Sequence, residues 1–341
     1  MKGDLLLKLV TYCVKADELN IQTEEIAGAR LGLVSGAWII DVGLAQRWLE
    51  IEKRLVFSHE IATEMGQCLA RGDAEFNALR EMERQLAQED IGTLQIEGEP
   101  VAIRLKEARL FAPVPVPNSF RDFYAFEQHV KTCRHKRGLP MVPEWYEIPV
   151  FYFSNHRSII GHESRVKKPE YTNELDFELE VACVIKKKGK NIPHERALEY
   201  IAGFTILNDW SARDEQRKEM AVGLGPAKGK DFATSMGPYL VTPDELEDRR
   251  SGEHWDLKMR ARINGKEVSS GNVKSLYWSF ARMIERASRD CELFPGDLIG
   301  SGTVGTGCIL ELGTDVHRYL EPGDVVELEV ERLGILKNLI I

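Results

Sequence analysis

The chain has 341 residues, of which 43% are hydrophobic and 29% charged, and its formal net charge is -9. This composition is typical of a globular protein, and the length allows two domains or one domain with an appendage. The acidic balance predicts no nucleic-acid partner, and the absence of long apolar runs and of CxxC pairs predicts a cytoplasmic protein with no membrane partner. The six scattered cysteines are interpreted as core or surface thiols.

The first part of the chain is predicted to form a small accessory domain. Residues 7–14 alternate weakly as a strand, and two β-rich runs on either side of Ser35-Gly36 predict a hairpin. Residues 73–89 place apolar side chains at helical spacing, with Asp73 as the expected N-cap. No cluster of reactive side chains appears here, so we expect residues 1–112 to be an accessory domain or a dimerisation element.

The second domain is expected over residues 113–341, after a junction with three prolines at every second position in residues 111–119. Asn264-Gly265 is typical of a type I′ hairpin turn. Strands are predicted at residues 150–153, 175–185, 203–207, 239–241, 257–263 and 325–330, and helices at 196–201, 212–220 and 276–289. The predicted fold class is therefore mixed α+β and β-rich.

Residues 175–184 (LDFELEVACV) carry the most informative pattern. Apolar residues alternate with Glu178 and Glu180, so both glutamates are expected on one face of a strand. A solvated face is the commoner explanation of such a pattern. However, Asp209 ends the next apolar run, and a third carboxylate there could complete an oxygen-ligand site for a hard divalent cation.

Residues 208–214 (NDWSARD) close a strand and open a helix. Ser211 as N-cap and Asp214 three residues later would form a capping-box arrangement. This structural explanation does not account for Arg213 and Gln216. These two share a helix face and could bind a carboxylate or an enolate near the acidic cluster.

Two glycine-rich loops and one histidine complete the set of candidate groups. Residues 225–234 lack the spacing of a phosphate-binding P-loop, so we interpret them as an ordered loop that holds Lys230 as an electrophilic group. Residues 300–307 allow a tight turn or close approach of a ligand to the backbone. His129 lies beyond the proline-rich junction and needs a partner before it can act as a base.

Together these motifs resemble those of the fumarylacetoacetate hydrolase superfamily, and most closely its fumarylacetoacetase-like members. They occur in the family's order and approximate spacing. The residues that carry the resemblance are 122–124, 176–180, 208–214, 229–232 and 300–307. The resemblance implies a β-roll-like catalytic domain over 113–341, a small N-terminal accessory domain and a homodimer.

The resemblance also implies a role for individual residues. The metal ligands would be Asp122, Glu178, Glu180 and Asp209. The cation would be Mg²⁺ in the first place, with Mn²⁺ or Ca²⁺ as alternatives. The catalytic groups would be His129, oriented by Glu311, together with Arg213, Gln216 and Lys230. The substrate pocket would be lined by Tyr124, Arg137, Tyr152, Thr234 and Thr303.

The implied activity is hydrolysis of a carbon–carbon bond in a fumarylacetoacetate- or acylpyruvate-like diketo acid, through a metal-bound enolate, with His129 and Glu311 activating water. Decarboxylation of oxaloacetate and isomerisation of a 2-oxo-3-enoate are alternatives, because both pass through the same enolate. A binding protein without turnover is a third, against which the retained carboxylates argue. Met220 stands where fumarylacetoacetase has a tyrosine, so the distal pocket differs.

Overall fold

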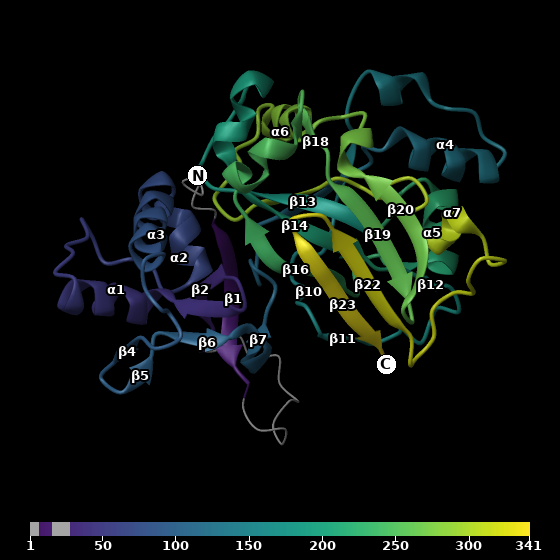
Figure 1. Cartoon of the computed structure of the whole chain (residues 1–341). Coiled ribbons are helices and arrows are strands. Elements are labelled where there is room, and N and C mark those ends of the chain that lie inside the picture. Colours follow the sequence, from purple (N-terminus) through teal and green to yellow (C-terminus); the bar gives the residue numbers. More distant parts are fainter. Residues whose placement is uncertain (1–6, 16–27) are drawn as a thin grey trace.

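Two β-sheets carry the fold of the computed structural model, which describes residues 7–15 and 28–341 (Figure 1). Over these residues the larger sheet has twelve strands and the smaller one five. The main path of the larger sheet runs through β6 (Ala102–Arg104), β3 (Trp38–Asp41), β2 (Arg30–Ser35), β1 (Lys8–Val14), β16 (Thr234–Val241), β14 (Ile201–Asp209), β13 (Leu179–Ile185), β21 (Leu298–Gly300), β8 (Phe120–Phe123) and β9 (Phe151–Phe153). The smaller sheet runs through β11 (Arg165–Val166), β23 (Gly334–Ile340), β22 (Val325–Val330), β19 (Lys258–Ile263) and β20 (Lys266–Asn272).

Short strands complete these sheets or form separate pairs. β7 (Ala108–Leu110) pairs with β1, and β10 (Ile159–Ile160) pairs with β16. The separate pairs are β4 (Gln95–Ile96) with β5 (Glu99–Pro100), β12 (Leu175–Asp176) with β15 (Ser211–Ala212), and β17 (Arg250–Ser251) with β18 (His254–Trp255).

The α-helices lie around the sheets, with the first three beside the N-terminal strands (Figure 1). They are α1 (Val42–Glu52), α2 (Met65–Arg71), α3 (Asp73–Leu86), α4 (Glu127–Lys136), α5 (Arg213–Val222), α6 (Phe280–Ser288) and α7 (Ile309–Leu312). Short 3₁₀ segments occur at Leu105–Glu107, Pro143–Tyr146, His194–Tyr200, Pro243–Arg249 and Val273–Ser275. The predicted mixed α+β, β-rich class is confirmed.

The N-terminal strands extend the same sheet that carries the C-terminal part. β1 pairs antiparallel with β16, with Lys8 opposite Val241 and Leu9 opposite Leu240. Hydrogen bonding is thus continuous across the predicted boundary between residues 112 and 113. The division into domains 1–112 and 113–341 stays a prediction.

The central strand β13 is buried on both faces, which corrects the expectation of one polar face. All seven of its residues are buried. Val181 and Cys183 belong to the core between the two sheets, whereas Ala182 and Val184 belong to the core under the N-terminal helices. The predicted strand over residues 175–185 is also broken, because Phe177 and Glu178 separate β12 from β13. Two covered faces leave no solvent for Glu178 and Glu180.

Turn chemistry is predicted well at one hairpin and imperfectly at another. Asn264 and Gly265 have φ values of 53° and 79°, as a type I′ turn requires. In the first hairpin, however, β2 includes Ser35 and pairs it with Trp38, so the turn is Gly36-Ala37.

The predicted helix caps are wrong. α3 begins at Asp73 with Gly72 as its N-cap, and α5 follows Ala212 without a side-chain cap. Ser211 Oγ instead donates to the carbonyl of Asp209. The Asp214 carboxylate accepts hydrogen bonds from Thr172 and from the backbone N–H of Asn173. Tertiary partners have displaced the local ones.

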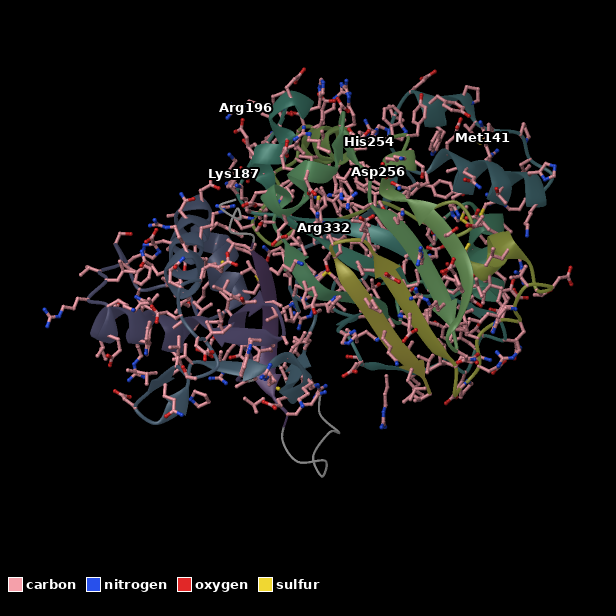
Figure 2. The ribbon with its side chains drawn as sticks, viewed as in Figure 1. Met141, Lys187, Arg196, His254, Asp256 and Arg332 are labelled. Atoms are coloured by element: carbon pink, nitrogen blue, oxygen red, sulfur yellow. The ribbon has the colours of Figure 1, made fainter. Side chains whose placement is uncertain are left out.

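Basic side chains in the run of residues 186–190 are paired locally. Figure 2 shows Lys187 beside the 3₁₀ segment that carries Arg196, and both contact Glu199, at 3.4 Å and 2.9 Å. Lys186 lies 2.5 Å from Asp73, and Lys188 lies 2.8 Å from Glu292. The run is therefore neutralised by neighbours rather than forming a basic face. Among the described residues, no helix is long and apolar enough to cross a membrane.

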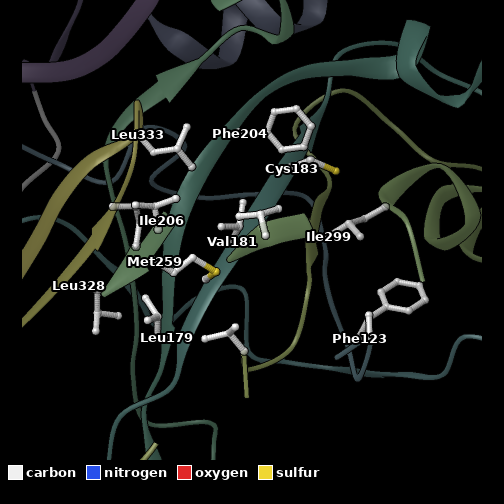
Figure 3. Packing of buried hydrophobic residues seen from close by; sticks show 14 of the residues in the cluster. Phe123, Leu179, Val181, Cys183, Phe204, Ile206, Met259, Ile299, Leu328 and Leu333 are labelled. Carbon is white, nitrogen blue, oxygen red and sulfur yellow. The ribbon is translucent and has the colours of Figure 1, made fainter. Parts of the chain in front are cut away.

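The core between the sheets joins strands that are distant in sequence. Figure 3 shows Val181 and Ile206 of the larger sheet beside Met259 and Leu328 of the smaller one. Each of these side chains is at most 1% exposed. This packing fixes the position of β13 and β14, the two strands that end at the acidic residues.

Replacing Leu328 by alanine should therefore lower the free energy of unfolding by about 2–5 kcal/mol, since it leaves a cavity between the sheets. The matched control is Ile335→Ala on the neighbouring strand β23, where the side chain is 43% exposed and the loss should be within ~1 kcal/mol. Urea denaturation followed by circular dichroism measures both, and equal losses would contradict this account of the core.

Candidate active site

The four carboxylates predicted as metal ligands gather at one end of the larger sheet. Gly300 of β21 pairs with Asp122 on one side and with Ala182 on the other. Residues in line across neighbouring strands point to the same face. Glu180, two residues before Ala182, therefore shares the face of Asp122. Leu207 lies opposite Glu180, and the strand places Asp209 on that face as well.

All four carboxylates are buried, and Glu178, at 5%, is the most exposed of them. The explanation of Glu178 and Glu180 as a solvated strand face is therefore excluded. The glycine-rich loop after β21 makes room for this cluster. Gly302 donates its backbone N–H to Asp122 Oδ1 at 3.2 Å, and a Cβ at Gly300 would collide with the same carboxylate. Glycine is thus required next to Asp122.

Lys230 inserts its ammonium between two of the carboxylates. Its Nζ donates to Glu178 Oε2 at 2.5 Å and to Asp209 Oδ2 at 2.7 Å, and the residue is 3% exposed. Burial works against the charged amine, but Asp209 and Glu178 raise the pKa of Lys230 above its ordinary value. The hydroxyl of Tyr152 also donates to Asp209. The glycine-rich loop therefore delivers Lys230 to the cluster, as the sequence predicted.

For the other carboxylates, Asp122, Glu180 and Asp209, the nearby positive charge is too small to offset the cost of burying them as anions. Burial, followed by the charge of Asp209, raises the pKa of Asp122, and burial followed by Asp122 raises that of Glu180. Burial also raises the pKa of Asp209, in spite of Lys230. The pKa of Glu178 is lowered instead, since burial is outweighed by its cationic neighbours, of which Lys230 is the largest. The cluster thus favours an additional cation.

Two buried carboxylate oxygens in this cluster have no hydrogen-bond partner among residues 7–15 and 28–341. They are Glu180 Oε2 and Asp209 Oδ1. Buried polar atoms are usually paired, and carboxylate oxygens are the ligands that hard divalent cations prefer. The donor set formed with Asp122 and Glu178 therefore fits a divalent cation of the Mg²⁺, Mn²⁺ or Ca²⁺ kind.

Arg213 and Gln216 project from the first turn of α5 toward the same cluster. The Nε of Arg213 donates to Asp176 Oδ2 at 2.8 Å, and Nη2 lies 2.8 Å from Glu178 Oε1. Nη1 donates to Gln216 Oε1 at 3.0 Å. Arg213 is only 2% exposed. The guanidinium is thus a second cation fixed beside the carboxylates.

His129 and Glu311 form the predicted pair across 182 positions of sequence. His129 Nδ1 is hydrogen-bonded to Glu311 Oε1, and both residues are buried. Glu311 Oε2 accepts from the backbone N–H of Thr306 at 2.9 Å. Tyr124 lies edge-on to the imidazole, with 5.3 Å between ring centroids. The histidine therefore has the oriented partner that a base requires.

The environment of His129 favours its protonated form. Burial alone would lower the pKa of the imidazole, but Cys133, Cys308 and Glu311 contact the ring and raise the pKa above its ordinary value. The carboxylate of Glu311 is the charge that holds an imidazolium in place.

The expected pocket residues fall into two groups. Thr303 Oγ1 donates to Glu180 Oε1 at 3.2 Å, and the buried hydroxyl of Thr234, beside Asp209 in register, has no partner. Tyr124 and Tyr152 lie on His129 and Asp209 as described. Arg137 is exposed at the end of α4, where its Nε donates to the carbonyl of Cys133, and its charge lies close enough to Tyr124 to lower the pKa of that hydroxyl, although burial raises it more. Its role as a carboxylate clamp stays a prediction.

Sequence reasoning gave no role to Asp176, although it belongs to the same motif as Glu178. It is completely buried. Its carboxylate accepts from Arg213 and from the backbone N–H groups of Ile309 (2.8 Å) and Leu310 (3.0 Å). Asp176 thus ties Arg213 to the start of α7, which carries Glu311. Its position two residues before Glu178 was the available signal.

Glu219 is a second group that the sequence did not reveal. Its carboxylate accepts hydrogen bonds from the backbone N–H groups of Ala227, Lys228 and Gly229. Those bonds fix the loop immediately before Lys230. Met220, which follows Glu219 on α5, is 42% exposed.

Replacing Asp176 by asparagine should lower the free energy of unfolding by roughly 3–5 kcal/mol, because it breaks a buried ion pair. The control is Glu174→Gln. Glu174 pairs bidentately with Arg217, whose side chain is 55% exposed, so the expected change is below ~1 kcal/mol. Chemical denaturation tests both, and a small loss in Asp176→Asn would show that the residue does not hold the site together.

Comparisons with known proteins agree with the geometry. Residues 118–341 match the family model described as "Fumarylacetoacetate (FAA) hydrolase C-terminal". The chain is 29% identical to a fumarylacetoacetase of Oryza sativa subsp. japonica over 286 residues, 66% of each chain. It is 30% identical to the oxaloacetate tautomerase YisK of Bacillus subtilis (strain 168) over 297 residues, 84% of this chain and 89% of that one.

A solved structure shares the fold. It is the fumarylpyruvate hydrolase from Pseudomonas aeruginosa in complex with Mn²⁺ and pyruvate, with a TM-score of 0.55 and 21% identity over 68% of this chain and 91% of that chain. The family model covers well over half of the chain and includes every residue of the acidic cluster. The chain therefore belongs to the fumarylacetoacetate hydrolase superfamily.

Proposed function

We propose that the protein is a divalent-metal-dependent enzyme that hydrolyses a carbon–carbon bond in a fumarylacetoacetate- or acylpyruvate-like diketo acid. The observation that carries the proposal is the buried pair of His129 and Glu311 next to the acidic cluster. The imidazole is close enough to Glu178 to lower the pKa of its carboxyl group. Burial, Lys230 and Arg213 have larger effects on that pKa than His129 has. An acid–base pair beside an oxygen-ligand site is what hydrolysis of such a substrate requires.

The carboxylates of Asp122, Glu178, Glu180 and Asp209 would hold the cation, with Mg²⁺ expected first. The Pseudomonas aeruginosa protein of the same fold was solved with Mn²⁺ and pyruvate, which supports a divalent ion and a 2-oxo acid here. When bound, such an ion would offset negative charge on the oxygens of the substrate.

The chain's own residues would then move the protons. Because Nδ1 of His129 faces Glu311, Nε2 is the nitrogen that takes a proton from water, and Glu311 stabilises the resulting imidazolium. Hydroxide adds to the carbonyl, and the carbon–carbon bond breaks with its electron pair on the leaving fragment. Lys230 and Arg213 would stabilise that negative charge as an enolate, and the His129 imidazolium would return its proton to the carbon of this fragment.

A second candidate function is proton transfer or decarboxylation on an oxaloacetate-like 2-oxo acid, or isomerisation of a 2-oxo-3-enoate. The name of the Bacillus subtilis relative, an oxaloacetate tautomerase with 84% of this chain aligned, supports it. Such reactions use the same cationic groups without attack by water. Incubation of the purified protein with Mg²⁺ and either an acylpyruvate or oxaloacetate distinguishes the two, since only hydrolysis yields pyruvate and a second carboxylic acid.

Replacement of His129 by alanine should reduce kcat for acylpyruvate cleavage by about 10²–10⁴-fold, since it removes the base. His135→Ala is the matched control, because His135 is exposed on the same helix and should leave the rate unchanged. Loss of the ultraviolet absorbance of the diketo acid measures the rate. Equal activity in wild type and His129→Ala would remove the histidine from the mechanism.

The rate should also depend on pH in a defined direction. Water activation needs neutral His129, whose pKa lies above its ordinary 6.5, so kcat should rise with pH through an inflection above 6.5. In Glu311→Gln the anion that stabilises the imidazolium is lost, so the inflection should move to lower pH. A rate that falls as pH rises through this range, or an inflection unmoved in the variant, would contradict the assignment.

A further inference from the structure

A second group of metal-ligand types lies at the meeting point of α4 and α7. The ligand atoms of His129, Cys133 and Glu311 all lie within 4.8 Å of one another, and the three residues are buried. A fourth candidate, Cys308, has its Sγ 3.9 Å from Glu311 Oε1 and contacts His129. His129 and Cys133 are one helical turn apart on α4, and Cys308 and Glu311 are similarly close on α7.

The spacing of the His129, Cys133 and Glu311 ligand atoms is compatible with three positions around a zinc-like cation. Cys133 Sγ lies 3.8 Å from both Nδ1 and Nε2 of His129. Zinc ligands at Zn–S of about 2.3 Å and Zn–N of about 2.1 Å lie roughly 3.5 Å from one another. His129 Nδ1 and Glu311 Oε1 are hydrogen-bonded, so they share one proton. A cation that replaced this proton would find the nitrogen of His129, the oxygen of Glu311 and the sulfur of Cys133 around it.

We propose that His129, Cys133 and Glu311, with Cys308 beside Glu311, form a thiophilic metal site that binds Zn²⁺ and, when occupied, inhibits the enzyme. Imidazole and thiolate ligands select zinc-like cations, whereas the all-carboxylate cluster around Glu180 selects hard cations such as Mg²⁺. The two sites therefore differ in the ions they take. The thiols lose their protons on binding.

Inhibition follows from the identity of one ligand. A cation on Nδ1 of His129 breaks its hydrogen bond to Glu311 and prevents the imidazole from serving as a base. This clause rests on the proposed function, whereas the existence of the site does not. Cys133 contacts His129 and is not one of the four carboxylates, so Cys133→Ser changes the zinc site without removing a ligand of the carboxylate cluster.

Titration with Cd²⁺ tests the site without any substrate. The full chain, saturated with Mg²⁺, should develop one equivalent of the ultraviolet charge-transfer band of cadmium–thiolate bonds. Cys291→Ser, which removes an exposed thiol, should keep the band, and Cys133→Ser should lose most of it, because Cys133 is the sulfur of the ligand group. If Cys133→Ser does not fold by circular dichroism, Glu311→Gln, which removes another ligand, should weaken Cd²⁺ binding at least roughly tenfold. No band in the wild type, or an undiminished band in Cys133→Ser, would overturn the proposal.

Zn²⁺ inhibition tests the regulatory part. Turnover with saturating Mg²⁺ should fall as Zn²⁺ is added. In Cys133→Ser, the Zn²⁺ concentration that halves the rate should be at least ~10-fold higher than in the wild type. The rate of each protein is compared with its own rate without Zn²⁺. Equal sensitivity in wild type and Cys133→Ser would overturn the inhibitory role. A protein that turned over neither substrate class would refute the proposed function yet leave the cadmium result as an independent test.

Discussion

Four carboxylates are buried at the end of one β-sheet, and in the described part of the chain one ammonium and one guanidinium form ion pairs with them. Lys230 bridges Glu178 and Asp209, and Arg213 lies on Glu178 from the other side. Burying unpaired anions is unfavourable, so burial and the neighbouring carboxylates raise the pKa values of Asp122 and Glu180. This end of the sheet therefore favours the binding of a cation. Two buried oxygens, on Glu180 and Asp209, have no hydrogen-bond partner among the described residues and are candidate ligands for it.

The fold maintains this arrangement by covering both faces of β13 and β14. One face packs against the smaller sheet and the other against the N-terminal helices, so neither strand can shift to relieve the repulsion. Asp176 adds a rigid connection, since it joins Arg213 to the backbone of α7. His129, the proposed base, is oriented from α7 through Glu311. Stability and chemistry therefore depend on the same few buried contacts, and a change at Asp176 should affect both.

The sequence predicted the parts of the site that depend on local pattern. The alternation around Glu178 and Glu180 and the end of the next strand at Asp209 were sufficient to suggest a cation site, and the Asn264-Gly265 turn was predicted from backbone sterics alone. Local pattern could not predict that β13 is covered on both faces, because burial depends on strands from both ends of the chain.

The errors have a common physical origin. Asp214 was expected to cap its own helix, but Thr172 and Asn173 from another loop compete successfully for its carboxylate. Asp176 escaped notice because two of its partners are backbone N–H groups more than a hundred residues away. Cys133 looked unrelated to Glu311 because the two residues come close only when α4 packs on α7. In each case the decisive contact joins residues that are distant in the sequence, so the local spacing of residues could not predict it.

The central claim is that the buried carboxylates form a divalent-cation site, and binding of Mn²⁺ to the full chain tests it most directly. Electron paramagnetic resonance of free Mn²⁺ in a titration gives both stoichiometry and affinity. We predict one site per chain in the wild type, and an affinity weaker by at least roughly tenfold in Glu180→Gln, which removes one carboxylate ligand. An unchanged Mn²⁺ affinity in Glu180→Gln, or no binding by the wild type, would contradict the account.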